Sequence, residues 1–177
     1  MSSSDAIDAP RVIDRLKGMG FKFKPEAVSA IADIIAETKS YQFSDAEQEV
    51  VEPILVAKTA DIALLDGHDD ITKPDVERMR RFCLIEHLTC LRSILTSQKI
   101  GASVLTAADS ELLESIGISD IMTLSSTSVS EIVEKAVAHV QASTPTVNIT
   151  TPNIDRFRRR VELWKFQAEY MLSVNPR

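Results

Sequence analysis

Glycine and aromatic residues are scarce in this 177-residue chain, which has 5 glycines and an aromatic content of 5%. Average proteins contain about 7% glycine, and folds built from β-hairpins depend on it at their turns. The scarcity therefore favours an all-α fold. Because hydrophobic residues still make up 44% of the chain, we expect an aliphatic core of Ile, Leu, Val and Ala.

Long apolar runs are also missing. No run approaches the roughly 20 residues that span a bilayer, and the opening Met-Ser-Ser-Ser-Asp-Ala lacks the basic-then-apolar pattern of a secretory signal. Cys83 and Cys90 lie seven positions apart, about 10 Å along a helix, which is too far for a disulfide. These features predict no membrane contact and a reducing compartment. We expect a cytoplasmic location and leave a nuclear or virion-associated one open.

The motifs of common enzymes are absent from the sequence. It contains no glycine-rich phosphate loop, no Gly-x-Ser-x-Gly nucleophile turn and no pair of histidines spaced to bind zinc. His87 and His139 stand alone on predicted helices, and Cys83 has no recognisable motif around it. We therefore predict a protein that is not an enzyme and that holds no cofactor and no metal.

The segment 64–74 is a tight, acidic elbow between two predicted helices. Gly67 stands where a helix C-terminus favours a residue that tolerates positive φ. Thr72 and Asp75 form a variant of the capping box that opens the next helix. The alternating acidic positions resemble a calcium loop, but Ile71 occupies the position where such a loop requires glycine. We predict that the elbow is a connector and does not bind calcium.

Helical periodicity and proline positions divide the chain into a bundle and a separate final helix. The longest predicted helix covers 73–97, whereas Pro53 is expected to kink or divide an earlier helix. A β-branched, proline-bounded stretch near the end predicts an extended linker. We predict an all-α orthogonal multi-helix bundle with a linker-tethered C-terminal amphipathic helix, divided as follows: 1–7, a disordered tail; 8–141, the helical bundle; 142–152, the linker; 153–177, the C-terminal docking helix.

The final predicted helix carries a narrow apolar seam at steps of three and four residues. Because an isolated helix of this length is marginal in water, it must dock on another surface to persist. We expect that surface to be a second copy of the chain or the groove beside helix 73–97. The predicted interface residues are Phe157, Val161, Trp164, Ala168 and Met171.

Four arginines crowd the first half of that helix: Arg156, Arg158, Arg159 and Arg160. They stand out in a chain whose net charge is −6. Affinity for nucleic acid comes from clustered Lys and Arg, so an acidic protein is poorly suited to it. We expect these arginines to pair with acidic groups of this chain or of a neighbouring subunit. A nucleic-acid contact is the alternative.

Residues 25–88 resemble two helical families. The stretch 57–76 has an alanine-rich helix, a glycine-containing turn and the sequence Ile71-Thr72-Lys73-Pro74-Asp75-Val76. It is similar to the helical lid of MoxR-type AAA+ ATPases. The same ending, together with Leu16-Lys17-Gly18-Met19-Gly20, also resembles a histone-fold transcription-complex subunit. Both resemblances imply a helical fold for this part, and the rest of the chain is unmatched.

These observations predict a non-enzymatic, helical assembly, structural or adaptor subunit that acts through protein–protein contacts. Such a subunit would belong to a virus or another large complex, and its partner would be another protein or a second copy of the chain. The alternative function is a histone-fold-like or nucleic-acid-associated regulatory factor. An enzyme with a cleft that only the tertiary structure would reveal is the third class.

Overall fold

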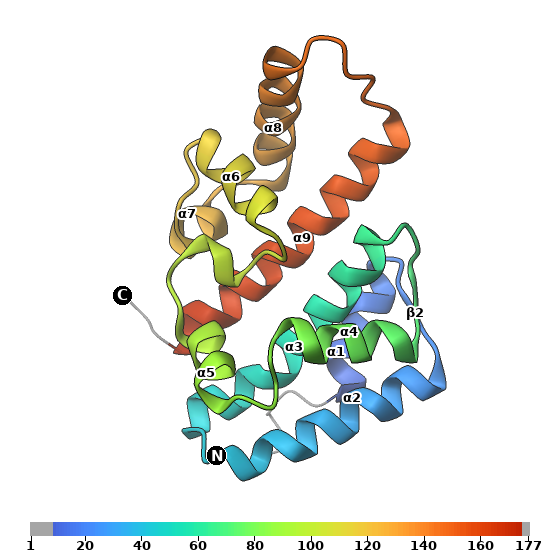
Figure 1. The fold of residues 1–177 in the computed structure, drawn as a ribbon, viewed down its shortest axis with the longest axis vertical. Helices are drawn as coiled ribbons and strands as arrows, with labels where there is room; N and C mark the ends of the chain where they lie inside the picture. The colour runs from blue at the N-terminus through green and yellow to red at the C-terminus, as the bar shows by residue number, and fades with distance from the viewer. Residues whose placement is uncertain (1–8, 175–177) are drawn as a thin grey trace.

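The computed structural model describes residues 9–174, except for the side chains of residues 9–11 and 88–89. The predicted disordered tail, 1–7, lies outside the described residues. Nearly all regular structure in the described range is helical, which confirms the predicted all-α class (Figure 1). The helices are α1 (Ala9–Gly18), α2 (Pro25–Thr38), α3 (Asp45–Leu65), α4 (Lys73–Phe82), α5 (Leu88–Thr96), α6 (Ala107–Ser115), α7 (Ile121–Ser126), α8 (Val129–Ser143) and α9 (Thr151–Val174), with short 3-10 helices η2 (Lys39–Tyr41) and η3 (Ile100–Ala102).

Helix α3 forms the centre of the fold. Its start is fixed by a capping box, in which the Ser44 hydroxyl accepts from the Glu47 N–H at 3.1 Å and the Ser44 N–H donates to the Glu47 carboxylate at 2.8 Å. Every residue from Val50 to Leu64 is buried. Pro53 lies inside this helix, which continues through it and is not divided as predicted. Packing on all sides stabilises α3 enough to offset the loss of the one backbone hydrogen bond that proline cannot make.

Helix α9 lies between two groups of helices (Figure 1). In the first group, α1, α4 and α5 contact α3, and α2 contacts both α3 and α4. The second group contains α6, α7 and α8. Helix α9 contacts α3 and α5 of the first group and α7 and α8 of the second. It therefore supplies part of the core of both groups.

The apolar seam of α9 is buried within the chain, against α3, α5, α7 and α8, so its burial requires no second copy. Val161, Trp164, Ala168 and Met171 are each 0% exposed, and Phe157 is partly buried. An isolated helix of this length is marginal in water and must dock to persist. The seam of α9 docks on the chain's own helices. The linker is also shorter than predicted, because α8 continues to Ser143 and α9 begins at Thr151. The connection is thus residues 144–150.

The predicted helix 73–97 is two helices, α4 and α5. The break lies at Leu84, whose left-handed backbone has a φ of +49°. The Leu84 N–H donates to the Arg81 carbonyl at 3.2 Å, and the Ile85 N–H donates to the Arg80 carbonyl at 3.1 Å. This is a Schellman ending, in which glycine usually occupies the left-handed position. Leucine gives no sequence signal for such an ending, so periodicity alone predicted one long helix.

We expect Leu84→Gly to raise the free energy of unfolding by about 1 kcal/mol, because the left-handed conformation costs an L-residue roughly 1–2 kcal/mol. The greater freedom of glycine in the unfolded chain offsets part of this gain. Leu65→Gly is the matched control, since both leucines are 43% exposed and Leu65 ends α3 in a helical conformation. The control should lose about 1 kcal/mol. Urea denaturation of both variants tests the pair, and a destabilised Leu84→Gly variant would contradict the prediction.

A short parallel pair of strands ties the elbow to the link between α1 and α2. Strand β1 (Lys22–Phe23) pairs with β2 (Asp70–Ile71) in the register Lys22↔Asp70 and Phe23↔Ile71. Gly67 has a φ of +93° and ends α3 as predicted. The elbow is therefore held in place from two directions, by the capped start of α4 and by β1.

Candidate functional site

An apolar pocket opens between α6, α8, the connection 144–150 and the start of α9. Its volume is about 190 Å³. The lining is mainly aliphatic, with one aromatic ring and two amides: Leu112, Ala136, Val137, Val140, Val147, Asn148, Ile149, Asn153, Ile154 and Phe157. We call this hollow the apolar pocket.

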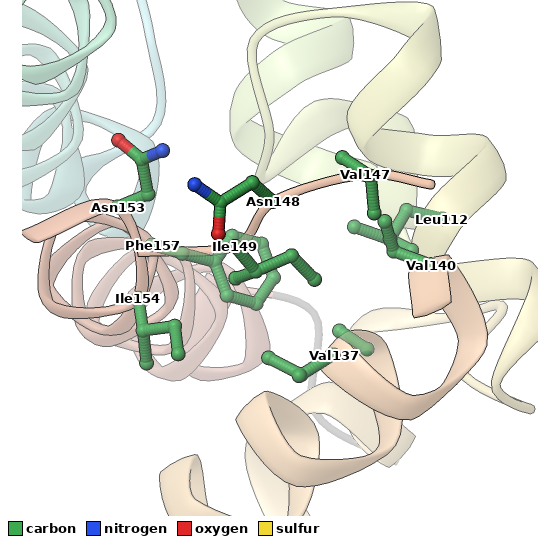
Figure 2. A pocket seen from close by; sticks show the side chains of 10 residues that line it. Leu112, Val137, Val140, Val147, Asn148, Ile149, Asn153, Ile154 and Phe157 are labelled. Atoms are coloured by element: carbon green, nitrogen blue, oxygen red, sulfur yellow. The ribbon is translucent and has the colours of Figure 1, made fainter. Parts of the chain in front are cut away.

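The connection 144–150 forms one wall of the apolar pocket. Figure 2 shows Ile149 projecting into the space between Phe157 of α9 and the two α8 valines, Val137 and Val140. Val147, from the same connection, is 40% exposed. Phe157 also packs edge to face on the ring of Trp164, with ring centroids 5.7 Å apart. The inner wall therefore rests on the buried core, while the connection borders solvent.

A second hollow, of about 260 Å³, adjoins the same end of α9. It is lined mainly by polar and charged side chains from the end of α3, the elbow and the first turns of α9: Leu64, Gly67, His68, Asp69, Pro152, Asp155, Arg156 and Arg159. We call it the charged cleft. The acidic elbow and the arginine cluster, which are far apart in the sequence, thus meet in the fold. Nothing in their sequence spacing indicated this meeting.

The four arginines of the cluster have different environments. Arg160 is buried and bonds Asp61 and Asp109. Arg159 is half-buried, lies 3.4 Å from an Asp69 oxygen and stacks over the ring of Phe21. The prediction of pairing with acidic groups is confirmed for these two arginines, and the acids belong to the same chain. The other two, Arg156 and Arg158, are exposed and half-buried respectively, and no ion pair is recorded for them among the described residues.

A buried ionic network joins α3, α6 and α9. Arg160 Nε donates to Asp61 Oδ1 at 2.6 Å, and its two terminal nitrogens donate to the Asp109 oxygens at 3.0 and 2.7 Å. Trp164 Nε1 donates to Asp61 Oδ2 at 2.7 Å. Burial raises the pKa of the Asp61 carboxyl, against the opposing attraction of Arg160. The network was not predicted, because Asp61 and Asp109 are distant in the sequence from Arg160 and Trp164 and each resembles a surface residue in isolation.

A second buried charge lies on the same central helix. Lys58 Nζ donates to the Ala102 carbonyl at 2.7 Å and to the Val104 carbonyl at 3.3 Å, which fixes the loop around η3 against α3. Burial lowers the pKa of Lys58. Nearby, burial raises the pKa of the Cys83 thiol to about 11. Neither Cys83 nor His87 lines the apolar pocket or the charged cleft.

The Cys83 thiol is expected to resist alkylation in the native protein. Because its pKa is about 11, roughly one thiol in a thousand is ionised at pH 8. Iodoacetamide should therefore modify the half-buried Cys90 first and reach Cys83 only after denaturation. Mass spectrometry of peptides from native and urea-treated protein measures this order, with Cys90→Ser as the control. Rapid native labelling of Cys83 would show that α3 and the end of α4 open readily.

Several polar side chains of the elbow are bonded to neighbouring residues. His68 Nε2 lies 3.1 Å from both oxygens of Asp75, and the Thr72 N–H donates to the same carboxylate at 2.9 Å. Asp66 pairs with Arg78. Across the part of the chain that the structure describes, no group of three or more His, Cys, Asp and Glu is arranged to hold a metal ion. The absence of calcium binding stays a prediction.

The chain matches no known protein family, no curated protein and no solved structure. Within residues 9–174, no helix combines the length and the apolar character needed to cross a membrane.

Proposed function

We propose that this chain is a non-enzymatic adaptor or assembly subunit that binds another protein through the apolar pocket. The observation that carries the proposal is the pocket itself, a hollow lined by aliphatic side chains and open beside an exposed connection. Water is a poor occupant of such a lining, because a bound water needs two to four polar partners. An apolar group is therefore favoured.

The size of the pocket favours a protein side chain over a metabolite. Small-molecule sites typically enclose about 300–1,000 Å³, whereas this pocket has about 190 Å³. That volume accommodates one large apolar side chain, such as Leu, Ile or Phe. Protein interfaces commonly depend on a few apolar anchors that fill pockets of this kind. The amides of Asn148 and Asn153 are the polar side chains of the lining and can bond the partner's backbone.

The nucleic-acid alternative has less support from the arginine cluster. Arg159 and Arg160 are bonded to carboxylates of the chain itself, so they are not free to neutralise phosphates. Fewer free cations lower the affinity for a phosphate backbone. The pairing of Arg159 and Arg160 within the chain therefore favours a protein-binding role over a nucleic-acid role.

Val147→Asp should weaken binding at the apolar pocket while leaving the fold intact. Val147 is 40% exposed at the pocket wall, so replacing it should change the free energy of unfolding only slightly. A carboxylate beside the entering apolar side chain would be desolvated without a partner, which should weaken binding about tenfold or more. The probe is a displayed library of random peptides, selected on the wild-type protein. Affinities of the selected peptides are then measured as synthetic peptides by fluorescence anisotropy.

Phe82→Asp is the matched control, since Phe82 is 47% exposed and lines neither the apolar pocket nor the charged cleft. We expect the selected peptides to share a large apolar residue, to lose affinity for Val147→Asp and to retain it for Phe82→Asp. Equal binding to both variants would refute the proposal. Sedimentation of the wild-type protein identifies the case in which the partner is a second copy, because Val147→Asp would then reduce the oligomer mass.

A further inference from the structure

We infer that the buried ion pair between Arg160 and Asp109 sets the shape of the apolar pocket and determines which apolar side chain of the partner fits it. Both are positioning residues, because neither lines the pocket itself. This inference rests on the proposed function and adds the residues that decide its specificity. It follows from where the ion pair lies relative to two walls of the pocket.

The ion pair spans the gap between α6 and α9. Helix α6 packs closely on α8 and η3, and α9 packs closely on α3, α5, α7 and α8. Arg160 reaches from α9 to Asp109, the third residue of α6. Its two terminal nitrogens donate to the two carboxylate oxygens at 3.0 and 2.7 Å. Such a two-point bond fixes the orientation of the partners as well as their distance.

Each end of the ion pair lies one helical turn from a pocket wall. Leu112 follows Asp109 by three positions on α6, and Phe157 precedes Arg160 by three positions on α9. Residues three positions apart are neighbours on a helix surface. Figure 2 shows Leu112 and Phe157 on different sides of the hollow. The length of the ion pair therefore limits how far apart these two walls can move.

The Phe157 wall is fixed by a second contact of the same network. Phe157 packs edge to face on Trp164, with ring centroids 5.7 Å apart. Trp164 Nε1 donates to one oxygen of Asp61 at 2.7 Å, and Arg160 Nε donates to the other at 2.6 Å. Asp61 and Trp164 are both buried, so water does not compete for these bonds. One guanidinium therefore positions both walls of the pocket against α3.

Asp109→Asn should make the pocket less selective among apolar side chains. Asparagine has nearly the shape of aspartate, but its amide nitrogen is a donor, so it cannot accept from both terminal nitrogens of Arg160. A fixed pocket disfavours a side chain that overfills it by about tenfold, whereas a pocket with mobile walls adapts to it. We expect Asp109→Asn to reduce the affinity ratio between the best and the worst apolar anchor by about threefold or more.

The experiment uses a peptide selected from a displayed random library on the wild-type protein. It is synthesised with Val, Leu, Phe or Trp as its apolar anchor, and fluorescence anisotropy gives the affinity of each version for the wild type and for Asp109→Asn. The titrations are made at a temperature at which circular dichroism shows both proteins to be folded. A smaller folded fraction would lower all four affinities equally, so the ratios between anchors report on the shape of the pocket.

Two further variants separate positioning from stability. Thr106→Ala removes the hydroxyl that accepts from the Asp109 N–H at 3.1 Å, which weakens the cap of α6 but keeps the ion pair. It should retain the wild-type ratios. Arg160→Lys keeps the positive charge but replaces the planar guanidinium with an ammonium that cannot form the two-point bond. It should reduce the ratios as Asp109→Asn does, and it provides the same test if Asp109→Asn does not fold.

A double-mutant cycle with Leu112→Ala tests the proposed route of the effect. Asp109→Asn should weaken the selected peptide by about fivefold in the wild-type background and by less than about twofold in Leu112→Ala, because the wall that Asp109 positions is then missing. A loss of stability alone would give the same factor in both backgrounds and would contradict the inference.

The outcomes distinguish this inference from the proposed function. If the peptides bind Val147→Asp as well as they bind the wild type, the proposed function fails first. If Val147→Asp weakens binding but Asp109→Asn and Arg160→Lys keep the wild-type ratios, the apolar pocket stands and the positioning role is refuted. If Thr106→Ala reduces the ratios as much as Asp109→Asn does, the stability of α6 explains the effect, and the positioning role is again refuted.

Discussion

Arg160→Met is expected to lower the free energy of unfolding by about 3–5 kcal/mol, the range measured when one partner of a buried ion pair is removed. The substitution keeps most of the side-chain volume but leaves Asp61 and Asp109 without their counter-ion. Asp61 is 0% exposed and Asp109 is 8% exposed, so neither carboxylate can be solvated without local opening. Arg160 also lies over the Trp164 ring, 5.0 Å from its centroid. Both the fold and the position of the tryptophan therefore depend on this guanidinium.

Urea denaturation followed by circular dichroism and by the fluorescence of Trp164, the only tryptophan, measures the effect. Arg158→Met is the control on the same helix, and a substitution away from a buried partner usually changes stability by less than about 0.5 kcal/mol. A loss below about 1 kcal/mol for Arg160→Met would show that the two aspartates are protonated or hydrated in the folded protein, and that the network contributes little.

The local endings of helices were the part of the fold that the sequence predicted best. Ser44 and Thr106 cap α3 and α6, because a hydroxyl at the residue just before a helix accepts a hydrogen bond from a free N–H of its first turn. Gly67 ends α3 in the predicted left-handed conformation. These features depend on residues close together in the sequence. Leu84 shows the limit, since the same ending occurs there without the residue that signals it.

Long-range contacts explain why the sequence left two docking surfaces open for α9. Its apolar seam indicated a helix that must dock, but periodicity does not identify the surface on which it docks. The pairing of Arg160 with Asp61 spans 99 positions, and that with Asp109 spans 51. No local pattern links such residues. The charged cleft has the same origin, because Asp69 and Arg159 are 90 positions apart.

The candidate site combines predicted and unpredicted parts. Phe157 and Arg156 were singled out from the sequence, and both line the hollows beside the start of α9. Val137 and Val140 of α8 were not singled out from the sequence; they are half-buried and form the pocket wall. A helical stripe of valines looks the same whether another helix covers it fully or leaves a gap. The apolar pocket forms where α6, α8, the connection 144–150 and α9 meet, and tertiary packing sets this arrangement.

A chain shortened to residues 1–150 is expected to lose its cooperative fold. Helix α9 contributes five large buried apolar side chains: Val161, Leu163, Trp164, Phe166 and Met171. Burying each stabilises the fold by about 1.5–3 kcal/mol, roughly 7–15 kcal/mol in all. Native domains have a total stability of only about 5–15 kcal/mol. The shortened chain would also leave Asp61 and Asp109 buried without Arg160.

Circular dichroism during thermal unfolding decides between this result and a tethered helix. A chain ending at residue 174 is the control, because it keeps every α9 contact described, and it should unfold cooperatively near the wild-type temperature. If α9 were only a docking appendage, residues 1–150 would stay folded without it. They would then show a sharp thermal transition and dispersed amide signals in nuclear magnetic resonance spectra. Because α9 joins the α3 group to the α7–α8 group, we expect a broad transition and poorly dispersed signals. Adding residues 151–177 as a separate peptide should restore part of the cooperative fold.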